Sequence, residues 1–178
     1  VTLHERSAGV CQPAVATPGD VIVFAPATAG SGLAILRQAR KEAAAIAALH
    51  QPRARVSEPL GDLPSVLSTR ANRPVLLHLA GHAEAYVDDD VHQLPGAGVN
   101  GRPLTASDVS ALPLTPGSVA IVLGCQTAAG PVHPGVGSLS LARAMLHAGA
   151  SVSIGSLFDI EDDLARTDRG HRRHVGIG

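Results

Sequence analysis

Short apolar runs of strand length alternate with longer amphipathic segments along most of this chain. Residues 21–25 and 118–123 are almost entirely apolar, which is typical of strands buried on both faces of a parallel sheet. Residues 33–49 instead carry Leu36, Ala39, Ala43, Ile46 and Ala47 at helical spacing, with charged residues between them. This alternation predicts an α/β protein with a mostly parallel sheet.

The rest of the sequence predicts further strands and helices of the same α/β architecture. We expect residues 21–25 to be a central strand, and Asp62 and Thr105 to cap short helices. Gly149 is expected to end a helix over residues 139–146. The other predicted segments are strands at 53–60, 74–80, 118–123 and 151–157, a hairpin or mobile loop at 88–101 and a Gly/Pro-rich loop at 127–137. We predict one domain over residues 20–163, between an irregular leader at 1–19 and a basic, disordered tail at 164–178.

His82 and Cys125 each follow a strand-like run, after Gly81 and Gly124 respectively. Open α/β sheets bind ligands beyond the carboxyl ends of their strands, so an imidazole and a thiol carried there could meet over one substrate. A neighbouring histidine can take the thiol proton and leave a strong nucleophile. The pair predicts a cysteine nucleophile with its histidine base, against the alternative of a buried cysteine beside a loop histidine.

Composition narrows the function classes. The 178 residues, 45% hydrophobic, suffice for one domain with a substantial core. A net charge of −1 gives no basic footprint for nucleic acid, and no apolar run approaches the ~20 residues that span a bilayer. Two cysteines, Cys11 and Cys125, are too few for a disulfide scaffold, so we expect a cytoplasmic protein without membrane or direct nucleic-acid contact.

Five ordered motifs resemble the CHAT domain family of caspase-like and separase-like cysteine peptidases. They are Leu-His-Leu-Ala-Gly-His at 77–82, Leu-Thr-Ala-Ser-Asp at 104–108, Val-Leu-Gly-Cys-Gln-Thr-Ala at 122–128, Leu-Ala-Arg-Ala at 141–144 with the Gly-Ala pair at 149–150, and Ser-Leu-Phe-Asp-Ile-Glu-Asp at 156–162. The resemblance implies a caspase-like three-layer α-β-α sandwich. It also implies that the domain is incomplete at its C-terminal end, where the family has a further helix and strand.

The same resemblance implies roles for individual residues. His82 matches the histidine of the dyad and Cys125 its nucleophile, while the backbone N–H groups of Ala83 and Cys125 match the oxyanion hole. Asp162 matches an acidic residue that helps to receive a basic substrate side chain, so cleavage after Arg or Lys is expected. The implied partners are a protein or peptide substrate and regulatory domains or an activating partner, with no metal or organic cofactor.

Departures from the family pattern keep other functions open. Ala83 stands where the family usually has glycine, and Gln126 stands where an acidic residue is common. The runner-up is therefore a weakly active or inactive CHAT-like module that binds proteins in a signalling or conflict-response system. A third alternative is a flavodoxin-like domain that binds a small ligand, with the dyad a coincidence.

Other conspicuous residues have plainer interpretations. His78 lies within an apolar strand and is interpreted as a satisfied core histidine. The acidic run 88–90 with His92 shows no recognised metal-ligand spacing, and Cys11 has no histidine nearby. The turn at 30–32 lacks the lysine of a phosphate-binding loop, so nucleotide binding is not expected.

Overall fold

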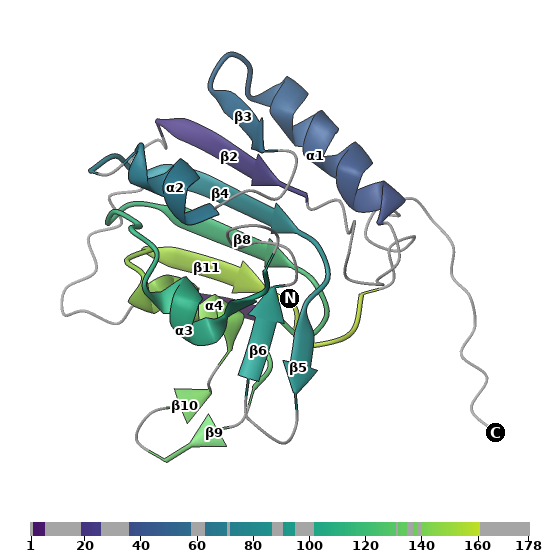
Figure 1. Cartoon of the computed structure of the whole chain (residues 1–178), viewed down its shortest axis with the longest axis vertical. Coiled ribbons are helices and arrows are strands. Elements are labelled where there is room, and N and C mark those ends of the chain that lie inside the picture. The colour runs from purple at the N-terminus through teal and green to yellow at the C-terminus, as the bar shows by residue number, and fades with distance from the viewer. Residues whose placement is uncertain are drawn as a thin grey trace.

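A computed structural model gives the fold, and it describes residues 2–5, 19–25, 36–57, 63–70, 72–86, 91–94, 102–130, 132–134, 137–138 and 140–160. Its centre is a six-stranded sheet (Figure 1). The strands, in spatial order, are β1 (Thr2–Glu5), β11 (Val152–Gly155), β8 (Val119–Leu123), β4 (Val75–Ala80), β2 (Asp20–Phe24) and β3 (Ala54–Ser57). All neighbouring pairs from β11 to β3 are parallel, whereas β1 runs antiparallel to β11. The predicted mostly parallel α/β sheet is confirmed.

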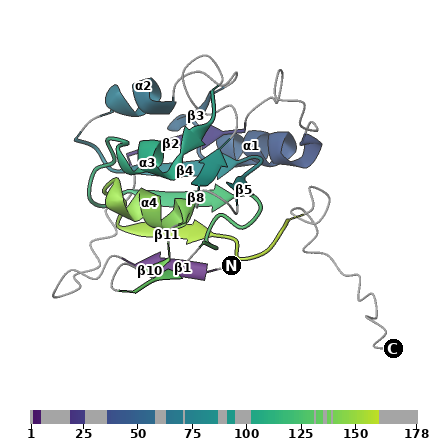
Figure 2. The same ribbon diagram turned by 60° about the horizontal axis from the view of Figure 1, so that its bottom comes forward.

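Helices cover both faces of this sheet, which makes three layers (Figures 1 and 2). Helix α1 (Arg37–Leu49) lies on one face, and its buried alanines pack in a cluster with Val21 and Val23 of β2. The other face is covered by α2 (Leu63–Ser68), α3 (Ala106–Ser110) and α4 (Leu141–His147), whose apolar residues share one core with alternate residues of the central strands. Because the strands bury side chains on both sides, their sequences read as continuous apolar runs.

Local signals place the helix ends as predicted. The hydroxyl of Thr105 accepts the N–H of Asp108, and the Asp108 carboxylate accepts the N–H of Thr105, which forms a capping box at α3. Arg102 pairs with this carboxylate at 3.1 Å, and its hydrogen bond is the main reason that the pKa of Asp108 falls to about 2. Gly149 follows α4 at a φ of 115°, a conformation that favours glycine.

Two small sheets lie beyond the main one. β5 (Glu84–Tyr86), β6 (Val91–Leu94) and β7 (Leu104–Thr105) form an antiparallel set. Of the segment 88–101, expected to be a hairpin or a mobile loop, residues 91–94 are described, and their pairing agrees with the hairpin. β9 (Val132–His133) and β10 (Gly137–Ser138) pair within the segment predicted to be an irregular loop. Strands of two residues carry no periodicity that a sequence pattern could reveal.

Two sequence predictions about the sheet are wrong. The leader is not wholly irregular, because β1 pairs with β11 through registers such as Leu3 with Ile154. Its four residues alternate too briefly to be told from a loop. The run at 21–25 is not a central strand either: β2 is buried and parallel, but it lies next to the edge strand β3, and the middle positions belong to β8 and β4. Interior strands look alike in sequence, so order within the sheet must come from the crossover connections.

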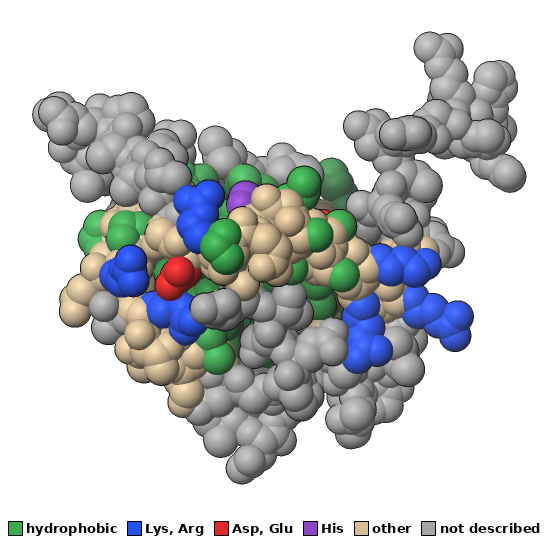
Figure 3. Space-filling model, turned by 90° about the horizontal axis from the view of Figure 1, so that it is seen from above, with side chains coloured by type: hydrophobic (Ala, Val, Ile, Leu, Met, Phe, Trp, Pro, Cys, Tyr) green, Lys and Arg blue, Asp and Glu red, His purple; other side chains and the backbone are tan. Residues whose placement is uncertain are grey.

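On the face seen in Figure 3, the basic side chains lie in two separate groups. Arg37, Arg40 and Lys41 are exposed in the first half of α1. Arg53 and Arg73 are exposed before the first residues of β3 and β4, at the opposite end of the parallel strands. The described residues therefore do not gather into one basic stripe of the kind that binds a nucleic-acid backbone.

Candidate active site

The strand register brings His82 and Cys125 to adjacent positions. β4 and β8 are neighbouring parallel strands, and Ala80 at the end of β4 lies opposite Leu123 at the end of β8. The N–H of Gly81 donates to the carbonyl of Leu123 at 3.0 Å, so the pairing continues one residue further. His82 and Cys125 are each two residues beyond this paired position, and neighbouring strands lie only about 4.8 Å apart. Both residues therefore lie at the carboxyl edge of the sheet, at the ends of neighbouring strands, as the sequence predicted.

Gly124 allows the strand ends to approach this closely. A Cβ atom on Gly124 would lie 2.6 Å from the carbonyl oxygen of Gly81 and 3.1 Å from the Cβ of Ala83. Cβ atoms do not approach a backbone oxygen to 2.6 Å, so only glycine fits at position 124. This close approach brings together the two chain segments that carry His82 and Cys125.

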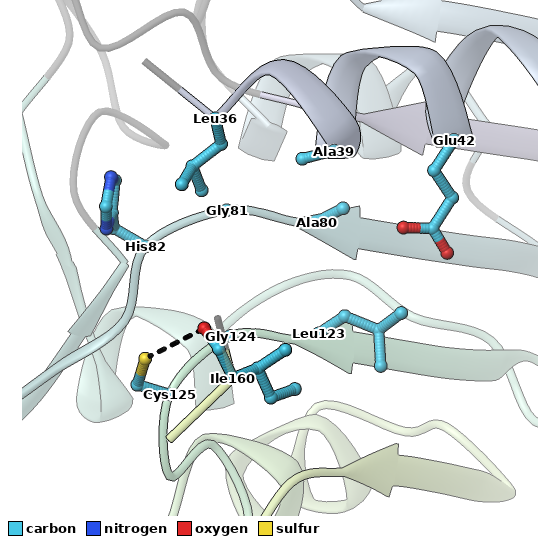
Figure 4. A pocket seen from close by; sticks show the side chains of 10 residues that line it. All are labelled: Leu36, Ala39, Glu42, Ala80, Gly81, His82, Leu123, Gly124, Cys125 and Ile160. Atoms are coloured by element: carbon cyan, nitrogen blue, oxygen red, sulfur yellow. Dashed lines mark hydrogen bonds between the residues drawn. The ribbon is translucent and has the colours of Figure 1, made fainter. Parts of the chain in front are cut away.

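Both side chains line one pocket of about 220 Å³. The pocket lies between the first half of α1 and the carboxyl ends of β4 and β8, and Figure 4 shows His82 and Cys125 at one end of it and Glu42 at the other. The lining residues are Leu36, Ala39, Glu42, Ala80, Gly81, His82, Leu123, Gly124, Cys125 and Ile160. Most of this wall is aliphatic, which is typical of small-molecule and side-chain sites.

The thiol of Cys125 has a hydrogen-bond acceptor at the pocket wall. Its Sγ lies 3.8 Å from the carbonyl oxygen of Ile160 and donates to it (Figure 4). The segment after β11 is held there because the N–H of Gln126 donates to the carbonyl of Phe158 at 3.2 Å and the N–H of Ala128 to that of Ser156 at 2.8 Å. A thiolate has no proton to donate, so ionised Cys125 would lose its bond to Ile160.

Thr127 fixes the turn that follows Cys125. Its buried hydroxyl donates to the carbonyl of Val122 at 2.7 Å and accepts the N–H of Ser156 at 2.9 Å. The preceding Gln126 has a φ of 54°, in the left-handed region. The Thr127 side chain thus connects the end of β8 to the end of β11 and sets the direction in which the chain continues from Cys125.

We expect Thr127→Val to lower the free energy of unfolding by about 1–3 kcal/mol, because valine keeps the shape but leaves the buried N–H of Ser156 without an acceptor. Urea unfolding would measure this. The matched control is Thr69→Val, at an exposed threonine whose hydroxyl donates to the Val66 carbonyl and can be replaced by water. That variant should stay within about 0.5 kcal/mol of the parent. Equal losses in the two variants would contradict the role of Thr127.

The backbone amides expected to form an oxyanion hole are available in this geometry. Neither the N–H of Ala83 nor that of Cys125 donates a hydrogen bond to another described residue, whereas their neighbours Gly81 and Gln126 do donate. Ala83 is buried. Buried backbone donors are nearly always satisfied, so the buried amide of Ala83 is the one that most needs an acceptor, whereas the half-buried Cys125 can also donate to water.

A model of the CHAT domain family matches residues 6–167, which is nearly the whole chain. The chain belongs to the CHAT domain family. This family is related to caspase-like peptidases, and the three-layer sheet agrees with that fold. No curated protein and no solved structure matches the chain. No described helix of this CHAT domain is long and apolar enough to cross a membrane.

At the other end of the pocket from His82 and Cys125, the CHAT domain has a contact between a glutamate of α1 and a histidine of β4. His78 Nε2 lies 3.5 Å from Glu42 Oε1, and the His78 side chain is almost fully buried. Burial lowers the pKa of His78 to about 4 and raises the pKa of Glu42 above its usual value. The interpretation of His78 as a core residue is confirmed, and among the described residues its Nε2 has the contact with Glu42 but no hydrogen bond.

This buried histidine predicts an acid-sensitive fold. The folded-state pKa of His78 is about 4 and the unfolded value is 6.5, so between these pH values the unfolded chain binds more protons. We therefore expect the free energy of unfolding to fall by up to roughly 3 kcal/mol as the pH drops from 6.5 to 4, less an opposing gain from protonation of Glu42. Urea titrations across this range should show the decline in the parent and a smaller decline in His78→Leu. Exposed His147→Leu serves as the control and should keep the parental slope.

Several residues singled out in the sequence lie outside the described residues. These are Asp162, Cys11, the acidic run 88–90, the turn at 30–32 and the possible cap Asp62. For His92 only the backbone is described, within β6. The described part of the CHAT domain contains no group of three or more His, Cys, Asp or Glu that could hold a metal ion. The role of Asp162 stays a prediction.

Sequence reasoning missed two residues that line the pocket, Glu42 and Ile160, and also Thr127, which fixes the turn after Cys125. A signal existed for Glu42, because it lies three residues after Ala39 and directly before Ala43, at the border of the apolar face of α1. A charged side chain at this border must either extend into solvent or line a cavity. No comparable signal marks Ile160 or Thr127, since the Ile160 carbonyl accepts from the distant Cys125 thiol and the Thr127 hydroxyl accepts the N–H of the distant Ser156.

Proposed function

We propose that this CHAT domain is a cysteine endopeptidase in which Cys125 attacks the scissile carbonyl and His82 transfers the protons. The observation that carries the proposal is the register of β4 and β8, which brings the two residues to adjacent positions in one pocket. A thiol and an imidazole at the same edge of the sheet have the arrangement of an activated nucleophile.

The reaction follows from ordinary thiol chemistry. His82 takes the proton of Cys125, and the thiolate sulfur forms a bond to the carbonyl carbon of the substrate. The C–N bond then breaks as the imidazolium returns the proton to the leaving amine, which leaves a thioester on Cys125. Water, deprotonated by His82, hydrolyses the thioester and restores the thiol. No oxidant, reductant or cofactor enters these steps.

The amides of Ala83 and Cys125 would stabilise the negative oxygen that forms during each attack. Both donate no hydrogen bond to another described residue, which leaves them able to bind this oxygen. One such donor is worth about 3–4 kcal/mol of barrier lowering in well-studied hydrolases. Ala83 keeps the N–H of the glycine that the family usually has, so the substitution removes no donor.

The substrate class and setting are also part of this proposal. We propose a protein or peptide substrate, cleavage after a basic residue with Asp162 contributing to its recognition, and control by flanking domains or an activating partner. We propose the cytoplasm as the compartment, because thiols are kept reduced there. The hydrogen bond from Cys125 to Ile160 supports the need for activation, because it must break before the thiol can ionise.

A second function, a protein-binding module with little or no turnover, is favoured by two observations. Ala83 replaces the usual glycine, and the recorded hydrogen bond of the thiol goes to Ile160. In that case the pocket would bind a segment of a partner without cleaving it.

Cleavage of a pooled fluorogenic peptide library by the purified chain separates the two functions. Turnover that stops after one equivalent of a peptidyl electrophile, with the adduct located on Cys125 by mass spectrometry, would support the peptidase. A folded chain that neither cleaves any peptide nor reacts faster with the electrophile than free cysteine would indicate the binding module.

A further inference from the structure

The pocket beside the dyad continues inward to a single carboxylate. Glu42 is the acidic residue among the ten that line the pocket, and Figure 4 shows its carboxylate turned into the space between α1 and the strands. The nearby wall consists of Leu36, Ala39, Ala80 and Leu123, which offer only aliphatic groups. A pocket with an apolar wall and one charged end accepts a long side chain with an apolar stem and a positive tip.

The dimensions agree with such a side chain. Glu42 is six residues beyond Leu36, which corresponds to about 9 Å along the axis of α1. Its partner His78 lies two residues before Ala80, or about 7 Å further along β4 from the catalytic edge. Glu42 therefore marks the inner end of the pocket, while His82 and Cys125 mark the end where the peptide bond would be cut.

The carboxylate of Glu42 has no cation to neutralise it in the described structure. His78 contacts it at 3.5 Å, but burial lowers the pKa of His78 to about 4, so this imidazole is neutral at neutral pH. No described Lys or Arg lies within ion-pair distance of Glu42, although Arg40 and Lys41 are on the same helix. A half-buried carboxylate without a counter-charge gains most when a cation enters.

We propose that Glu42 is the specificity residue of this site, and that it binds the guanidinium group of a substrate arginine whose stem lies along Leu36, Ala39 and Leu123. The inference rests on the proposed peptidase function and assigns the recognition of charge to a residue on α1. Arginine fits better than lysine because its guanidinium is less strongly hydrated and can donate two parallel hydrogen bonds to one carboxylate.

Peptide cleavage gives the first test. The ratio of kcat/KM for a substrate with Arg before the scissile bond to that for a matched norleucine substrate should fall roughly 10- to 100-fold in Glu42→Gln, which removes the charge at constant size. The control Lys41→Gln alters an exposed charge on the same helix and should leave the ratio unchanged. An unchanged ratio in Glu42→Gln would overturn the assignment, as would a parent enzyme that prefers norleucine. A preference for Lys over Arg that is lost in Glu42→Gln would keep the role of Glu42 but overturn the choice of arginine.

Binding without turnover keeps this inference separate from the catalytic proposal. Agmatine, a guanidinium on a four-carbon chain, should bind to the Cys125→Ala chain in isothermal titration, and at least tenfold more weakly to Cys125→Ala with Glu42→Gln. If agmatine binding depends on Glu42 but no peptide is cleaved by the parent, the peptidase proposal fails and the cation site stands. If peptides are cleaved at Cys125 but neither agmatine binding nor substrate preference depends on Glu42, the site assignment fails and the peptidase stands.

Discussion

Replacement of Cys125 by alanine is expected to lower peptide cleavage at least about a thousandfold, since the covalent route requires the sulfur. His82→Ala should cost about 10²- to 10⁴-fold, because the thiol then lacks a positioned base. The two side chains act as a unit at the ends of β4 and β8. The double variant should therefore be hardly slower than the slower of the two single variants. Values of kcat for the three variants on one substrate would show this.

These losses must be separated from unfolding. Cys125 and His82 lie at the rim of the sheet and are only half-buried, so circular dichroism and urea midpoints should change little in the variants. His147→Ala, at an exposed histidine near the end of α4, should retain full activity. Multiplicative losses in the double variant would mean that the two residues act independently, and full activity in either single variant would exclude the dyad.

Gly124→Ala is expected to affect stability and activity together. The new methyl group would lie 2.6 Å from the Gly81 oxygen, so β4 and β8 must separate at their carboxyl ends. Overpacking of this kind costs about 1–3 kcal/mol, and a shift of about 1 Å between catalytic groups can lower the rate about a hundredfold. Urea unfolding and kcat/KM would measure the two effects.

Gly19→Ala is the matched control for this substitution. A Cβ atom at this position would lie 3.8 Å from the Pro74 oxygen, which is an ordinary contact. Gly19 directly precedes β2, at the end of the strand that is far from His82 and Cys125. Stability should stay within about 0.5 kcal/mol of the parent, with activity unchanged. If Gly124→Ala behaved like this control, the close approach of the strand ends would not be what positions the dyad.

The hydrogen bond between Cys125 and Ile160 links the proposed nucleophile to the segment after β11. This segment is held by the backbone amides of Gln126 and Ala128, so the wall of the pocket and the turn after the cysteine form one unit. Binding of a substrate peptide that displaces Ile160 would release the thiol toward His82. Such a displacement is a reason to examine activity in the presence of candidate partners as well as with peptides alone.

Much of the fold could be predicted because local patterns carry it. Continuous apolar runs indicated buried parallel strands, and the Thr105 cap and Gly149 marked helix ends that the structure confirms. Position in the sheet could not be predicted: the edge strand β1 was taken for an irregular leader, and β2 was expected at the centre. Hydrophobic alternation shows whether a strand is buried but not which strand lies beside it.

The candidate site could likewise be predicted from the sequence only in part. The sequence by itself determined that a histidine and a cysteine, each after a buried strand and a glycine, emerge at the same edge of a parallel sheet, and so which residues could carry the proposed chemistry. Only the tertiary structure decided that β4 and β8 are neighbours in a register that brings His82 opposite Cys125, and that Glu42 of α1 closes the far end of their pocket. The physical reason is that residue type and local spacing are properties of the chain, whereas distances between segments arise when helices and strands pack to bury their apolar faces and satisfy their backbone groups.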